Sequence, residues 1–551
     1  MERKRLGVVV DGSFTAGLTV RLDPGCSTED LQIGSFMVVQ GREYTYFCML
    51  ADLQLRTSDA RLIAKPPQGF TPFVSRVLSG SATYAMAVVK PMLMMPTVDV
   101  VDPSRQLAGD TPEERGVMSV RTIPMHYAEL VEATEMDFAT VFGSADKANH
   151  FVIGQPLTMD LPICLDLARF MERSSGLFGQ TGTGKSFTAL LILAGIIQHD
   201  VGSTLIFDAH NEYAYGKESE AKQWVRGLKS LFGSKVLVYS LDEAQANKSG
   251  RPADGILKIG MNQIEPEDVI LMSQELGLTA KAGTMIGLLK DRYNAAWLTR
   301  LIEMGPEELS EFCEQSGAHV GSVQALQRDL KKLARKEYVR PEMDSNLLDE
   351  IIQALKDGKH VILHFGKHST MMDYMLVSNL VTRRVRAAWE AWTEQYERTK
   401  ESRDRPRPLM ITVEEAHKFL NPEIASQTIF GTIAREMRKF HVTLMVIDQR
   451  PSGIDSEVLS QLGTRISGKL ADERDIEAVL TGVSDRSALR NALASLKLRQ
   501  EVLVVGHAVP MPIQVRPRNY DEAFWKEVSV SSGSLPVDEK LEQEKRELFG
   551  A

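Results

Sequence analysis

The stretch GLFGQTGTGKSFTAL, residues 176–190, decides the fold of this chain. It matches the pattern G-x-x-x-x-G-K-[ST], whose backbone amides surround a phosphate chain, and it requires a strand before the loop and a helix after it. We expect Lys185 to reach the β- and γ-phosphates and Ser186 to hold Mg²⁺, with the positive N-terminal end of the helix directed at the nucleotide. The alternative is a glycine- and threonine-rich loop that binds nothing. The positions assigned to the nucleotide are Gly179, Gln180, Thr181, Gly182, Thr183, Gly184, Lys185, Ser186 and Phe187.

The length and composition indicate an ordinary soluble protein of two or three domains. The chain has 551 residues, of which 43% are hydrophobic and 25% charged. We expect a cytoplasmic protein without a membrane partner, because no run of about 18 apolar residues occurs and the N-terminus becomes polar too soon for a signal peptide. The four cysteines form no C-x-x-C pair, which argues against a zinc site or a disulfide framework. The net charge of -9 leaves the class of partner open.

Residues 1–150 read as a small N-terminal β-barrel. Short β-rich runs alternate with turn signals from residue 5 to about 123. Residues 102–116 have the composition of a mobile loop, and we expect the run VMSVRTI, residues 117–123, to return as a strand that closes the barrel.

Residues 151–527 have the pattern of an α/β domain. Apolar strands alternate with helical stretches, which predicts a mostly parallel sheet buried on both faces. Between about 264 and 356 the strand pattern stops and amphipathic helices take over, so we expect a helical insertion there. The charged tail, residues 528–551, is either a solvated helix or an arm that reaches a neighbouring subunit.

Two adjacent carboxylates end one of the apolar strands, in PLMITVEEAHKF. In a P-loop sheet we expect Glu414 to act on Mg²⁺ through a water molecule and Glu415 to be the general base that polarises the attacking water. Acids at a strand end are otherwise solvated surface residues, but the apolar run and the upstream P-loop favour catalysis.

Three polar side chains follow another apolar strand, in LIFDAHNEY. Asp208, His210 and Glu212 would face a nucleotide cleft if they lie at the carboxyl end of a parallel strand. A metal site is possible, although no further ligand pair lies at a matching spacing. The alternative is a capping turn with Asp208 as the cap.

A third strand ends at Gln449, and a basic segment precedes it. An amide at this point can sense the γ-phosphate or orient the lytic water. Upstream, Arg435 and Arg438 are three residues apart, which places them on one face of a helix. They form either a solvated basic face or, in a ring, an arginine finger that inserts into the neighbour's site.

Taken together, these motifs resemble the HerA family, hexameric ATPases related to the FtsK-type DNA translocases. The resemblance rests on the order and spacing of the P-loop, DAHNEY at 208–213, EEAH at 414–417, AREMRKF at 434–440 and DQRPS at 448–452. It implies a RecA-like P-loop ATPase core behind a HAS-barrel-like domain. A leading glutamate is usual in this family, which supports Glu414.

The resemblance also assigns residues. It carries the catalytic base onto Glu415, the trans arginine onto Arg435 or Arg438 and the phosphate sensor onto Gln449, and it suggests a role for Arg173 just ahead of the P-loop. Two departures leave the subfamily open: Asn211 stands where the family commonly has glycine, and Ser175 where it commonly has a histidine before the glycine.

The function that the resemblance implies is ATP-driven DNA translocation or unwinding by a hexameric ring, with DNA in a central channel. A nuclease of the NurA type would act with it in DNA end processing or defence. In the alternative, the ring is a scaffold that assembles and switches an antiviral effector enzyme without directional movement on DNA. A protein-moving secretion ATPase would need a membrane partner, which nothing in the sequence suggests.

Overall fold

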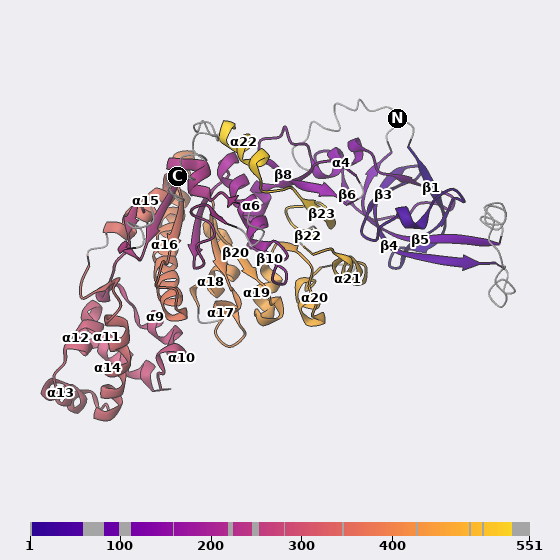
Figure 1. Ribbon diagram of the computed structural model, residues 1–551. Coiled ribbons are helices and arrows are strands. Elements are labelled where there is room, and N and C mark those ends of the chain that lie inside the picture. Colours follow the sequence, from indigo (N-terminus) through magenta and orange to yellow (C-terminus); the bar gives the residue numbers. More distant parts are fainter. Residues whose placement is uncertain are drawn as a thin grey trace. The chain divides into compact units, whose positions relative to one another are not determined.

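The computed structural model divides the chain into two compact units (Figure 1). The first unit comprises residues 1–188, 449–452 and 462–519, and the second comprises residues 189–448, 453–461 and 520–551. The structure describes residues 3–58, 82–97, 112–157, 159–218, 224–244, 253–279, 281–343, 346–425, 428–483, 486–498 and 501–531. Most of the expected mobile loop at 102–116 and nearly all of the charged tail lie outside the described residues.

The first unit begins with a closed antiparallel β-barrel, as the sequence predicted. Its strands follow the order β2-β1-β7-β3-β4-β5, and pairing of β2 with β5 closes the circle. The bounds are β1 Arg5–Ser13, β2 Gly17–Leu22, β3 Phe36–Gln40, β4 Tyr44–Thr57, β5 Thr83–Pro96 and β7 Glu129–Glu132. The expectation that residues 117–123 close the barrel is wrong. Only β6, Met118–Ser119, forms there, and it pairs with β5, whereas β7 joins β1 to β3.

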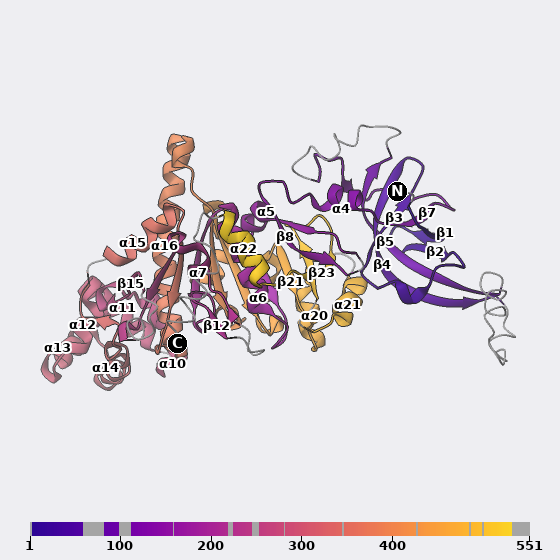
Figure 2. The same cartoon turned by 45° about the horizontal axis from the view of Figure 1, so that its top comes forward.

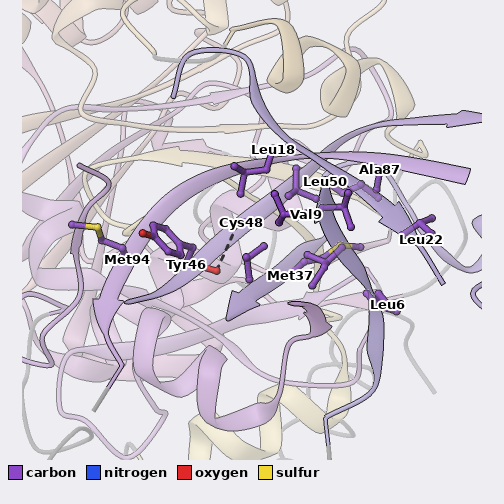
Figure 3. Packing of buried hydrophobic residues seen from close by; sticks show 14 residues of the cluster. Leu6, Val9, Leu18, Leu22, Met37, Tyr46, Cys48, Leu50, Ala87 and Met94 are labelled. Atoms are coloured by element: carbon purple, nitrogen blue, oxygen red, sulfur yellow. Dashed lines mark hydrogen bonds between the residues drawn. The ribbon is translucent and has the colours of Figure 1, made fainter. Parts of the chain in front are cut away.

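Alternating side chains of these strands fill the barrel interior. Figure 3 shows Leu6, Val9, Leu18, Met37 and Leu50 among the side chains that pack together inside it. Each of these is at most 4% exposed, as expected where one face of every strand is turned to a core.

The remaining strands of the first unit run from the P-loop strand into an antiparallel extension. Their order is β10-β21-β22-β23-β8-β9, in which only β10 and β21 pair in parallel. The bounds are β8 His150–Pro156, β9 Ile163–Asp166, β10 Ser175–Phe178, β21 Thr464–Ser467, β22 Val502–Gly506 and β23 Ile513–Pro517. The expected mostly parallel sheet is thus mixed, because this end is antiparallel.

The second unit contains the parallel part of the sheet, and here the prediction is confirmed. Its strands follow the order β15-β14-β18-β11-β19-β20, and every pairing among them is parallel. The bounds are β11 Ser203–Asp208, β14 Val236–Ser240, β15 Gly255–Ile256, β18 His360–His364, β19 Leu409–Glu414 and β20 Val442–Asp448. Strands β11, β19 and β20 are buried along their whole length, which explains their continuous apolar sequences.

A helical insertion lies in the second unit where the sequence predicted it. Its helices are α9 Pro266–Leu271, α10 Ser273–Leu276, α11 Ala282–Tyr293, α12 Trp297–Glu303, α13 Pro306–Ser316, α14 Val320–Ala334 and α15 Asn346–Lys356. Figures 1 and 2 both show α11 to α14 as one group. One strand interrupts the insertion, contrary to expectation: β17, Val339–Arg340, pairs in parallel with β16, Ile259–Gly260.

Helix α16, Met371–Thr399, anchors the insertion to the sheet. The buried Asp268 of α9 accepts hydrogen bonds from Arg383 at 2.7 Å and from Asn379 at 2.6 Å. Asp373, in the first turn of α16, accepts from Tyr338 at 2.6 Å. Although α16 is long, no helix within the described ranges combines the length and hydropathy needed to cross a membrane.

The last described helix is α22, Glu522–Ser531. It runs across residue 528, where the sequence suggested that the charged tail begins, so the first four residues of that segment are helical.

Candidate functional site

The P-loop of the first unit connects β10 to helix α6, Lys185–His199. Gly182 and Gly184 have φ angles of 78° and 89°, in the left-handed region that glycine adopts without steric cost. A Cβ atom on Gly179 would lie 2.5 Å from the Thr183 hydroxyl oxygen, so this position also needs glycine. The glycines therefore allow the tight turn that the motif predicted.

Lys185 lies folded back over the loop. Its ammonium group donates to the carbonyl oxygens of Gly179 at 2.7 Å and Gln180 at 3.1 Å. The Thr183 hydroxyl also donates to the Gln180 carbonyl, at 2.8 Å. The lysine charge is thus held over the loop, where phosphate oxygens can replace the carbonyls. Of the last two predicted nucleotide contacts, Ser186 is half-buried and Phe187 is exposed.

Two further predicted residues belong to the first unit. Gln449 accepts a hydrogen bond from the Thr181 hydroxyl at 2.6 Å, so the structure brings it onto the P-loop. Arg173 lies between helix α5, Leu167–Glu172, and β10. Its Nε atom is buried and has no hydrogen-bond partner in the part of the chain that the structure describes.

In the second unit, Glu414 is the last residue of β19 and is fixed on both its side chain and its backbone. Its Oε1 atom accepts from the Tyr213 hydroxyl at 2.8 Å. Its backbone N–H donates to the Tyr374 hydroxyl at 3.2 Å, and its carbonyl accepts from that hydroxyl at 3.3 Å. Burial, helped by the carboxylates of Asp208, Glu212 and Glu415, raises the pKa of Glu414 to about 8, against the Tyr213 hydrogen bond, which lowers it.

The second oxygen of Glu414 fits a divalent cation. Oε2 is buried, and no described residue forms a hydrogen bond with it. A buried carboxylate oxygen without a partner is costly, whereas Mg²⁺ prefers such oxygens, directly or through water. The residues present therefore suit the Mg²⁺ that a nucleotide brings with it.

Glu415 differs from its neighbour in exposure and in backbone conformation. Its side chain is 29% exposed, so water reaches the carboxylate. Its φ angle is 50°, in the left-handed region that costs a non-glycine residue about 1–2 kcal/mol. The turn is held by the backbone N–H of Lys418, which donates to the Glu415 carbonyl at 2.9 Å. Strain of this kind is typical of functional positions.

Asp208 organises a turn beside these acids. Its buried carboxylate accepts backbone hydrogen bonds from Glu212, Tyr213 and Ala214 at 2.8, 3.1 and 3.3 Å. Burial raises the pKa of Asp208 in spite of these bonds. The arrangement matches the capping alternative, although a turn rather than a helix follows. Asp208 thus positions Tyr213, which in turn holds Glu414.

A metal site at Asp208 and His210 has no support in the structure. His210 is exposed and Glu212 is half-buried. The described ranges contain no group of three or more His, Cys, Asp or Glu side chains that could hold a metal ion.

The two candidate finger arginines do not share one α-helix, so that part of the prediction is wrong. Helix α18, Ile429–Glu436, carries Arg435, and a 3₁₀ helix that begins at Met437 carries Arg438. Arg435 is half-buried and donates to the Ala425 carbonyl at 3.4 Å. Arg438 is exposed. Of the two, Arg438 is the more exposed.

The sequence analysis assigned no role to Tyr374, His417 or Asp448, which lie around the acids. Tyr374 lies on α16, 40 residues before Glu414, and no local pattern links the two. His417 was quoted only as part of EEAH. Its ring nitrogen Nδ1 lies 2.9 Å from the carboxylate of Asp448, the last residue of β20.

Comparisons with known proteins show a likeness to the HerA helicases over part of the chain. The family model for the central domain of the helicase HerA matches residues 151–385, which include the P-loop and Asp208 but end before Glu414. The DNA double-strand break repair helicase HerA of Pyrococcus furiosus is 26% identical over 385 residues, which are 66% of this chain and 69% of that protein. The protein of the same name from Sulfolobus acidocaldarius is 24% identical over 70% of this chain and 71% of its own.

Two solved structures show a more distant likeness. VirB4 of Thermoanaerobacter pseudethanolicus aligns with a TM-score of 0.41 and 15% identity, over 68% of this chain and 98% of that one. The bacterial conjugative coupling protein TrwB aligns with a TM-score of 0.44 and 11% identity, over 69% of this chain and 90% of that one.

Proposed function

We propose that this P-loop protein, which is similar to the HerA helicases over about two thirds of its length, couples ATP hydrolysis to movement along DNA. The relatives are named as helicases of DNA double-strand break repair, and this name supports DNA as the substrate. We also propose a RecA-like ATPase domain over residues 151–527, with its insertion at about 264–356, after a barrel domain over residues 1–150. A protein that acts on DNA in this way would work in the cytoplasm.

The observation that carries the ATPase mechanism is the contrast between two adjacent acids. Glu414 is buried with one oxygen unpartnered among the described residues, whereas Glu415 is accessible to water on a strained turn. Two carboxylates in different environments suit two roles, as in other enzymes that pair them. In this proposal Glu415 would accept the proton of the attacking water, and Glu414 and Ser186 would be the residues that hold Mg²⁺. The cation, when bound, neutralises phosphate charge.

The remaining residues act on the phosphates. Lys185 exchanges its two carbonyl partners for β- and γ-phosphate oxygens, and the P-loop amides bind the phosphate chain. Gln449, already in contact with the loop, orients the lytic water or senses the γ-phosphate. Arg173 and Phe187 border the loop on either side.

For assembly we propose a homohexameric ring with DNA in its central channel. An exposed arginine such as Arg438 would then complete the neighbouring subunit's site. A NurA-type nuclease or a defence effector would be the partner. A ring that only scaffolds an effector would retain the same catalytic residues, so movement on DNA has to be tested directly.

The test is displacement of a protein roadblock from a DNA duplex, with ATP turnover measured in the same reaction. We expect ATP-dependent displacement by the wild-type protein and none by Glu415→Gln. ATP turnover without displacement on duplex or tailed DNA would contradict translocation and would favour the alternative in which the ring only scaffolds an effector. Absence of turnover under all these conditions would contradict the ATPase mechanism itself.

A further inference from the structure

We infer that His417 is a positioning residue for the hydrolytic step: anchored on the buried carboxylate of Asp448, it holds the carboxylate of Glu415 in place. The inference deepens the proposed function, because it rests on Glu415 as the general base. It adds a residue pair that acts through the base and does not touch the nucleotide.

The first step is the anchor. Asp448 ends β20, and its side chain is wholly inaccessible to solvent. One of its oxygens, Oδ2, accepts two hydrogen bonds from the same residue: from the His417 backbone N–H at 2.7 Å and from ring Nδ1 at 2.9 Å. Since His417 is the first residue of helix α17, His417–Leu420, its N–H has no partner within that helix and is satisfied by the carboxylate. Backbone and ring are thus fixed together.

The second step is the direction of the ring. Because Nδ1 is committed to Asp448, the other nitrogen, Nε2, points elsewhere, and it lies 3.8 Å from Oε2 of Glu415. This separation is longer than a hydrogen bond but is within the range of a charge pair. Both side chains are about 30% exposed, so a water molecule can approach the same carboxylate.

The third step is the charge of the ring. The hydrogen bond to Asp448 raises the pKa of His417, and the charges of Asp448 and Glu415 raise it further, against burial and the Lys418 ammonium. The ring therefore keeps its proton to a higher pH than an ordinary histidine and attracts Glu415 as an imidazolium. This attraction is present below the raised pKa and disappears as the pH rises through it.

The fourth step is the need for such a contact. Glu415 has a φ angle of 50°, so its backbone gives the side chain an unusual direction. Small errors in the placement of a base reduce rates strongly, and a contact that fixes its direction is worth roughly tenfold to a hundredfold in rate. In the chain, Asp448 is followed directly by Gln449, which contacts Thr181 of the P-loop. The anchor of the base and the proposed phosphate sensor are therefore consecutive residues.

The test compares two substitutions of one ring. His417→Asn places an amide N–H near the position of Nδ1, so the bond to Asp448 is kept while the nitrogen that faces Glu415 is lost. His417→Ala loses both. We expect His417→Asn to lower kcat roughly tenfold to a hundredfold, with the KM for ATP and the affinity for a non-hydrolysable analogue within about twofold of wild type. The wild-type kcat should fall on the alkaline side as His417 loses its proton, and His417→Asn should lack that limb.

A control and a reference variant separate the possible outcomes. Lys418→Gln removes a charge from the next residue of α17 without touching Asp448, and it should keep the wild-type kcat and an alkaline limb. A wild-type kcat and pH profile for His417→Asn, alongside an inactive Glu415→Gln, would overturn the positioning role and leave the proposed function intact. A fully active Glu415→Gln would remove the base assignment and this inference together. If His417→Ala does not fold, the His417→Asn variant still decides the matter.

Discussion

The hydroxyl of Thr181 donates a hydrogen bond to the side-chain oxygen of Gln449, with 2.6 Å between the two atoms. This contact keeps the amide on the phosphate-binding loop before any nucleotide arrives. We therefore expect Gln449→Ala to lower kcat for ATP by at least about tenfold while nucleotide affinity changes little, because orientation of water is lost and phosphate binding is not. Steady-state turnover and nucleotide titration measure the two effects. Gln461→Ala, at the end of α19 (Ser456–Gln461), is the matched control, and equal turnover in both variants would exclude Gln449 as the sensor.

Lys185→Ala should abolish nucleotide-dependent activity and leave the fold intact. The ammonium group donates to the backbone carbonyls of Gly179 and Gln180, and the residue is half-buried and not part of the buried core. We expect ATP binding to weaken strongly because the charge on the β- and γ-phosphates is lost. Circular dichroism and thermal unfolding check the fold, and nucleotide titration checks the binding. Wild-type turnover in a folded variant would disprove the role of the loop.

Glu415→Gln should bind ATP and hydrolyse it far more slowly. The amide keeps the shape of the side chain but cannot accept the proton from water. We expect a loss of more than about a hundredfold in kcat, with ATP retained after rapid removal of unbound nucleotide. A loss below about tenfold, equivalent to ~1.4 kcal/mol in the barrier, would show that Glu415 is not the base.

Glu414 should make stability depend on pH when Mg²⁺ and nucleotide are absent. Burial raises its pKa from 4.5 to about 8. A carboxyl whose folded-state pKa lies above its unfolded value contributes stability that is fully present below pH 4.5 and is lost as the pH rises through about 8. The free energy of unfolding should therefore fall between pH 5 and 8, by up to about 1.4 kcal/mol per pH unit.

Glu414→Gln should flatten this dependence, because the amide accepts the Tyr213 hydrogen bond and carries no charge. The measurement is chemical unfolding at several pH values in the presence of a chelator. Glu423→Gln, on an exposed position of the same unit, should retain the wild-type slope. Parallel curves for wild type and Glu414→Gln would show that Glu414 does not titrate in this range.

If the protein forms the proposed ring, Arg438 should act on the neighbouring subunit's nucleotide. The expectation favours Arg438 over Arg435, because Arg438 is exposed and Arg435 is bonded to Ala425. Mixing Arg438→Ala with Glu415→Gln subunits should restore activity that neither variant has alone, since some interfaces regain a complete site. Lys439→Ala, exposed on the same 3₁₀ helix, should remain active alone. Mixed rings without activity would contradict a role of Arg438 in the neighbouring site and would favour the alternative that it belongs to a solvated basic surface.

The parallel strands and the P-loop were predictable because each is determined by residues that are close together in the sequence. A strand that is buried on both faces reads as an unbroken apolar run, and β11, β19 and β20 each do so. Strand β7 of the barrel, which joins β1 to β3, could not be found in this way. Its sequence, ELVE, has only four residues, two of them charged, and it becomes a strand through pairing with β1 and β3.

The residues of the candidate site were predictable on the same basis, since local patterns could be found and tertiary contacts could not. Glu414 and Glu415 were visible because a strand pattern ends in two acids, and the P-loop because its glycine spacing is dictated by backbone geometry. The contacts of Tyr374 and Asp448 were not visible, because they join residues 40 and 31 positions apart through tertiary packing. The break between α18 and the following 3₁₀ helix was hidden as well, since three-residue spacing suits either helix type.

The left-handed backbone at Glu415 lowers the stability of the fold at the residue that we propose as the general base. Glycine would adopt a φ angle of 50° without steric cost, so Glu415→Gly would relieve about 1 kcal/mol of strain and delete the carboxylate. A screen that rewards heat resistance alone should accept glycine at this position, whereas a screen that rewards ATP turnover should reject it. If Glu415 is the proposed base, thermal stability at this turn is lower than glycine would allow because catalysis needs the carboxylate, and consensus-style stabilisation should leave residue 415 untouched.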